Sequence, residues 1–111
     1  MPKVTSIVSR VTNRISLVQG HDYELIGIED SSFRIVDESG EPALHPKSCF
    51  LECENIPPHD WKYHDFGDGV YSYYPPEFAS IGFFEDHADG EQTAVQSFTR
   101  YLESRNLPDR S

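Results

Sequence analysis

The chain has few basic residues and no long apolar run, and each shortage excludes a class of protein. Nine lysines and arginines stand against 19 aspartates and glutamates, so the formal net charge is -10. A surface of that sign repels phosphate backbones and attracts basic partners, which disfavours nucleic-acid binding. No segment approaches the roughly 18 apolar residues of a membrane span, and the alternating N-terminal segment is not a signal-peptide core. We therefore expect a cytoplasmic protein without membrane contact.

The chain has only two cysteines, Cys49 and Cys53. If the segment between them is extended, their Cα atoms lie about 13 Å apart, too far for a disulfide. A metal site would need two further ligands, and the spacing fits no standard zinc site. We expect two reduced thiols.

The sequence also lacks the familiar catalytic motifs. It has no nucleophile elbow, no glycine-rich phosphate loop and no paired-acid signature. Residues 65–67 spell the kinase magnesium motif, but no other kinase element accompanies them. We expect neither enzymatic activity nor a cofactor.

A short region combines imidazole and carboxylate side chains of the kind that bind zinc, manganese or iron. Its members are His59, Asp60, His64, Asp65 and Asp68. Their spacing matches no recognised site, and turns favour aspartate and glycine for backbone reasons alone. A solvated turn is the preferred interpretation, and a small metal-dependent enzyme stays open as an alternative.

Residues 20–52 predict three short strands joined by two tight turns. Residues 23–28 and 33–36 are rich in aromatic and β-branched side chains, whereas 37–40 has turn chemistry with Gly40 at a left-handed position. The apolar positions change parity between Leu25 and Ile26, which indicates a bulge. Pro42 indicates an edge strand or a bulge, because proline donates no ladder hydrogen bond. Residues 4–11 alternate like an earlier strand, and 12–20 read as a loop.

This first half resembles a group of short bacterial and phage SH3-like proteins. The positions that carry the resemblance are Leu17, Gly20, Tyr23, Glu24, Leu25, Phe33, Arg34, Ile35, Asp37, Gly40, Glu41, Leu44, Pro46, Lys47 and Phe50. His45 stands where that pattern has tyrosine. The resemblance implies a small SH3-like antiparallel β-barrel over residues 1–54 and carries no catalytic motif.

The second half predicts an aromatic β-hairpin and one helix. Residues 61–74 form the hairpin, with its turn at 65–69 and cross-strand rings between its arms. Apolar residues at helical spacing between Ala94 and Leu102 predict an amphipathic helix over 89–105, with Asp89 as its N-cap. Its apolar face should cover the barrel or the hairpin. The predicted fold is therefore α+β, with one domain over residues 1–105: the barrel, a hairpin extension at 55–84, the helix, and a flexible tail at 106–111.

Aromatic rings beside acidic residues predict a protein-binding surface. The candidate contacts are Trp61, Tyr63, Tyr73, Glu85, Asp86 and Asp89. We expect a non-enzymatic binding module of a bacterial or phage cytoplasm with a basic protein partner, such as an immunity or inhibitor protein against a basic toxin or nuclease. A reader of proline-rich peptides and a structural accessory of phage assembly are further alternatives. The sequence leaves the oligomeric state open.

Overall fold

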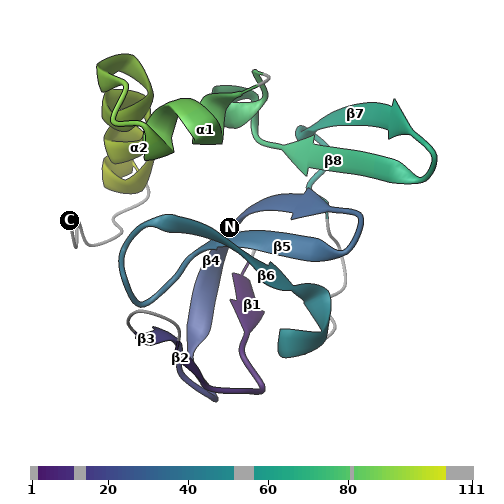
Figure 1. Cartoon of the computed structure of the whole chain (residues 1–111), viewed down its shortest axis with the longest axis vertical. Coiled ribbons are helices and arrows are strands. Elements are labelled where there is room, and N and C mark those ends of the chain that lie inside the picture. Colours follow the sequence, from purple (N-terminus) through teal and green to yellow (C-terminus); the bar gives the residue numbers. More distant parts are fainter. Residues whose placement is uncertain (1–2, 12–14, 52–56, 81, 105–111) are drawn as a thin grey trace.

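The fold is α+β, in a computed structural model that describes residues 3–11, 15–51, 57–80 and 82–104 (Figure 1). Five strands of a six-stranded antiparallel sheet follow the order β6-β5-β4-β8-β7, and β1 pairs with β4 off that path. Their bounds are β1 (Lys3–Thr5), β4 (Asp22–Glu29), β5 (Ser32–Val36), β6 (Pro42–Pro46), β7 (Lys62–Gly67) and β8 (Val70–Tyr74). The remaining elements are the paired strands β2 (Arg10–Val11) and β3 (Ile15–Leu17), the helices α1 (Phe83–Ala88) and α2 (Gln92–Ser104), and 3₁₀ turns at Lys47–Cys49 and Pro76–Phe78.

The predicted strand over residues 4–11 is wrong as a single element. β1 ends at Thr5, one isolated bridge joins Ser6 to Phe50, and β2 starts only at Arg10. The Ser6 hydroxyl donates to the carbonyl oxygen of Val8 at 2.6 Å, and such local bonds compete with a strand ladder. The predicted loop at 12–20 contains β3.

β4 is buried on both faces, which explains its irregular sequence pattern. All residues from 23 to 28 are buried, and the pairing with β5 shifts register between Leu25 and Gly27, confirming the bulge. One face contributes to a first core of Val4, Leu17, Tyr23, Leu25, Ile28, Phe33, Ile35, Cys49, Phe50 and Trp61. Ile26 belongs to a second core with Phe78, Phe83, Phe84, Ala94, Phe98, Tyr101 and Leu102. The strand therefore separates two apolar layers.

The ladders between the named strands do not close, so an SH3-like barrel is not confirmed. Two predictions about the β5–β6 hairpin are confirmed. Gly40 has φ +81°, and β6, with Pro42 at its start, ends the strand path. Cys49 is buried with a free thiol, and Cys53 lies outside the described residues.

α2 confirms the predicted amphipathic helix, but its N-terminal cap is not Asp89. Asp89 follows α1 and donates its backbone N–H to the carbonyl oxygen of Glu85 at 2.9 Å. The Glu91 carboxylate caps α2 instead by accepting from the N–H groups of Ala94 and Thr93, and these bonds lower the pKa of Glu91. The short helix α1, which the sequence analysis did not predict, buries Phe83 and Phe84.

Within the described ranges, no helix is long and apolar enough to cross a membrane.

Candidate protein-binding surface

The β7–β8 hairpin projects from the sheet beyond the region that the helices cover (Figure 1). Its tip reverses at Asp68 and Gly69, with φ +53° and +80°, the left-handed pair of a type I′ turn. Tyr63 pairs with Tyr73 across the arms, and His64 with Ser72. The hairpin predicted over residues 61–74 is therefore present, and its two-residue turn lies within the predicted turn at 65–69.

The two arms differ in burial. Every residue of the outer strand β7 is exposed, including Tyr63 and Phe66 at 55% each. The inner strand β8 buries Ser72 and half-buries Tyr73, which packs against the first core. β8 therefore joins the hairpin to the body, and β7 is presented to solvent.

Three tyrosines form a cluster on one face of the hairpin. The ring of Tyr63 lies 4.9 Å from that of Tyr73 and 6.3 Å from that of Tyr71, measured between centroids. Partial desolvation and the nearby Asp65 carboxylate raise the pKa of Tyr63. The Tyr63 hydroxyl therefore stays protonated at neutral pH, and the three rings give this face polar hydroxyl tips.

The other face borders a groove against α1. The rings of His64 and Phe66 lie 4.3 Å apart. Both line a groove of about 260 Å³ whose opposite wall includes Phe83 and Glu85. The structure thus places one predicted acidic contact, Glu85, on the same groove as the His64 and Phe66 rings.

A polar network fixes β8 to the body of the sheet. The Tyr74 hydroxyl donates to Glu29 at 2.5 Å and accepts from Arg34 Nε at 3.0 Å, and burial raises the pKa of Tyr74. The same ring lies on Gly27, where an added Cβ would fall 2.0 Å from Tyr74 Cε1. Since only glycine allows this approach, the base of the hairpin has a defined position.

The predicted contact residues lie in different environments. Trp61 is 9% exposed and belongs to the first core, so its prediction as a surface contact is wrong: this large apolar ring fills the core. Glu85, Asp86 and Asp89 are exposed on α1 and just after it. Sequence reasoning missed Phe66 and Val70, which is 45% exposed. Their position beside a tight turn in an outer arm was the available signal.

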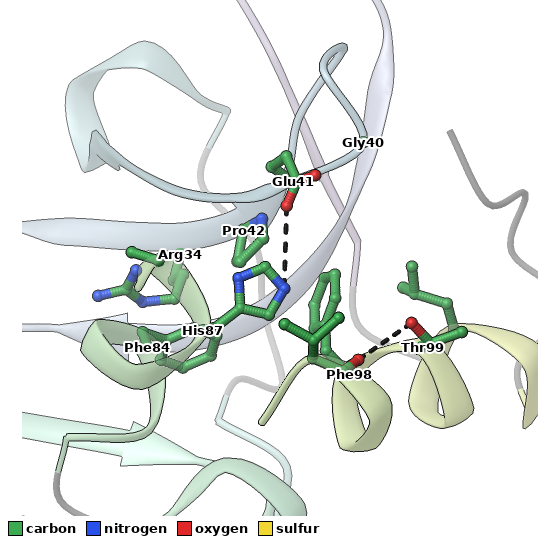
Figure 2. Close-up of a pocket in the computed structure, with 11 residues that line it drawn as sticks. Arg34, Gly40, Glu41, Pro42, Phe84, His87, Phe98 and Thr99 are labelled. Carbon is green, nitrogen blue, oxygen red and sulfur yellow. Dashed lines mark hydrogen bonds and ion pairs between the residues drawn. The ribbon is translucent and has the colours of Figure 1, made fainter. Parts of the chain in front are cut away.

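A larger cavity of about 500 Å³ separates the β5–β6 turn from the helices (Figure 2). Arg34, Glu41 and His87 supply its charged or titratable groups. His87 Nε2 lies 3.8 Å from the Glu41 carboxylate, and the Arg34 guanidinium stacks on the Phe84 ring at 4.1 Å. The Thr99 hydroxyl donates to the Val95 carbonyl oxygen at 3.0 Å, and is therefore not poised as a nucleophile. The polar groups that line this cavity therefore already have partners within the fold.

The described part of the chain contains no group of three histidine, cysteine, aspartate or glutamate side chains able to hold a metal ion. The cluster around His59 and His64 is spread along an exposed segment and β7.

Comparisons with protein-family models, with curated proteins and with solved structures found no match. A fold alone does not determine an activity, so function has to be inferred from the exposed hairpin and its surroundings.

Proposed function

We propose that this chain is a non-enzymatic protein-binding module that contacts its partner through the β7–β8 hairpin. The supporting observation is the exposure of Tyr63 and Phe66, 55% each, on opposite faces of one projecting hairpin. Aromatic side chains supply large contact areas at a small conformational cost and are frequent energetic anchors of interfaces. The hairpin offers such rings on a base fixed by Tyr74.

The partner in this proposal is a basic protein. The chain has a net charge of -10, and Glu85, Asp86 and Asp89 lie on the α1 side of the hairpin groove or just beyond it. Complementary charge speeds association and selects against wrong partners. The concrete form is an immunity or inhibitor protein of a bacterial or phage cytoplasm that blocks a basic toxin or nuclease.

An SH3-like barrel over residues 1–54 is part of the proposal. Around the Ser6–Phe50 bridge, the Ile7 N–H donates to the Cys49 carbonyl oxygen at 2.9 Å and the Leu51 N–H donates to that of Thr5 at 3.0 Å. These bonds join the first strand to the segment after β6, as closure of a small barrel would require.

The test is co-purification of a partner from the cells that encode the protein, with a tagged wild type and a Tyr63→Ser/Phe66→Ser double variant. We expect the double variant to lose the partner and a Leu44→Ser control to retain it, since Leu44 is 43% exposed but lies on β6. Equal retention by all three proteins would exclude the hairpin as the contact surface.

Charge and rings should have separable kinetic effects on the purified pair. Glu85→Gln should slow association and reduce its salt dependence, whereas Tyr63→Ser should mainly speed dissociation. Glu103→Gln removes the same charge from the far end of α2 and serves as the matched control. Equal effects of Glu85→Gln and Glu103→Gln on the association rate would show that the acidic residues of α1 do not steer the partner locally.

A further inference from the structure

The two ends of the strand path are protected differently against pairing with another chain. β6 begins and ends with proline, at Pro42 and Pro46, and each removes a backbone donor. β7 ends the path on the other side, and Lys62–Gly67 contains no proline. Its pairing with β8 is regular from Lys62 to Asp65 and shifts register only between Asp65 and Gly67. Among the residues that the structure describes, no strand pairs with the outer side of β7, so residues 62–65 present a regular edge.

Both faces beside this edge carry a ring and a carboxylate. Tyr63 and Asp65 share a face because they are two residues apart on a regular strand. On the other face, Phe66 and Glu85 line the same groove. A lysine or arginine side chain fits either face, because its stem can cover a ring and its charged end can reach a carboxylate.

Charge decides between a partner strand and a second copy of this chain. Residues 59–69 contain Asp60, Asp65 and Asp68 against Lys62 as the one lysine or arginine. A dimer through β7 would bring these acidic segments together, and each copy carries a net charge of -10. A basic segment is instead attracted by the same negative charge.

We propose that an extended, basic segment of the partner protein adds to β7 as a further strand of the sheet. This inference rests on the proposed function and names how the partner binds. In strand addition the main-chain hydrogen bonds supply affinity, and alternate side chains supply specificity. The recognised segment carries lysine or arginine on the face near Asp65 or the face near Glu85, and its side chains cover the rings of Tyr63 and Phe66.

The probe is a synthetic peptide of about eight residues in which lysine and valine alternate, a length typical of a strand. It is titrated into the ¹⁵N-labelled full chain, and amide hydrogen exchange is followed by NMR. We expect exchange to slow at alternate amides of β7 and to stay unchanged in β6. A peptide with glutamate in place of lysine should not bind.

The deciding control is a lysine peptide that is N-methylated at its two central residues, one lysine and one valine, so that a donor is removed from whichever edge pairs with β7. It keeps the charge but loses ladder donors, so we expect its binding to be at least about tenfold weaker, the effect of losing one or two hydrogen bonds. Equal binding by the two lysine peptides, or protection without alternation in β7, would overturn strand addition. The hairpin could then still bind through its rings, so the proposed function would stand on the co-purification result.

Two other outcomes would also overturn the inference. Spectral changes confined to residues outside the hairpin would place the peptide elsewhere. Sedimentation of the free chain as a dimer with slowed exchange in β7 would identify the occupant of the edge as a second copy. Failure of the proposed function is a separate result, namely full retention of the native partner by the Tyr63→Ser/Phe66→Ser variant.

Discussion

The β5–β6 and β7–β8 hairpins belong to one sheet and have similar turns. The first is packed into the fold, whereas the second is exposed to solvent. Both turns place a glycine at positive φ, Gly40 at +81° and Gly69 at +80°. In both, an aspartate accepts a hydrogen bond from the N–H two residues ahead, Asp37 from Ser39 and Asp65 from Gly67. Asp37 is buried and Asp65 is exposed. Turn chemistry therefore sets the chain reversal, whereas packing decides whether a hairpin stabilises the fold or remains available for contact.

The buried hairpin also holds a polar pair that the exposed hairpin lacks. Asp37 Oδ2 lies 3.2 Å from His45 Nε2, with both side chains about 95% buried. Burial alone would raise the pKa of Asp37, but the bonds from His45 and Ser39 outweigh it and lower that pKa. His45 Nδ1 has no hydrogen-bond partner among the described residues. Asp37 therefore fixes both the turn and one orientation of the His45 ring.

The two hairpins should differ most in the unfolding free energy that is lost when one phenylalanine in each is replaced by alanine. Phe33 is 7% exposed in β5 and belongs to the first core, whereas Phe66 is 55% exposed in β7. Phe33→Ala should lower the free energy of unfolding by about 3 to 5 kcal/mol, and Phe66→Ala by less than about 0.5 kcal/mol. Urea denaturation followed by circular dichroism measures both. Similar losses would mean that β7 is packed in solution.

The corresponding aspartates of the two hairpins, Asp37 and Asp65, should give the next largest difference in stability. Asp37→Ala leaves His45 and the Ser39 N–H without their acceptor in a buried site, and should cost about 2 to 3 kcal/mol. Asp65→Ala removes an equivalent turn bond that water can replace, and should cost less than about 1 kcal/mol. The same denaturation experiment compares them. An Asp37→Ala variant as stable as Asp65→Ala would contradict the structural role of the buried pair.

How far the sequence predicted these hairpins depends on the range of the signals. Gly40, the turn before Val70 and the apolar stripe of α2 are local patterns, and each was read correctly. The burial of Trp61 was not predicted. An aromatic ring beside two prolines is typical of a contact surface, and its burial depends on residues of the first core that are distant in the sequence. The helix over Phe83–Ala88 was missed because it is short and depends on burying Phe83 and Phe84 in a second core. Phe66 was overlooked because the exposure of β7 depends on which of the two hairpin strands pairs with the rest of the sheet.

Acid should weaken the buried hairpin selectively. The folded-state pKa of Asp37 lies below its ordinary value of 3.8. Its contribution to stability is therefore present above that value and is lost as pH falls through the lower folded-state pKa. We expect wild type to lose more unfolding free energy between pH 5 and pH 2 than an Asp37→Asn variant. Asp65→Asn makes the same change of charge on the exposed hairpin and is measured alongside as the matched comparison. Parallel curves for wild type and Asp37→Asn would show that Asp37 titrates alike in the folded and unfolded chains.

The turn glycine of the exposed hairpin should give the smallest effect. An added Cβ at Gly69 meets no atom within 4 Å, so a substitution there changes only the cost of its left-handed backbone. Gly69→Ala should cost about 1 to 2 kcal/mol of hairpin stability, and Gly69→Asn less, because asparagine tolerates that conformation. Since β7 adds little buried area, local opening of the hairpin can absorb this cost before the whole chain unfolds. We therefore expect faster amide exchange in β7 with less than about 0.5 kcal/mol lost from global unfolding. A full loss in global stability would instead mean that the exposed hairpin unfolds together with both cores.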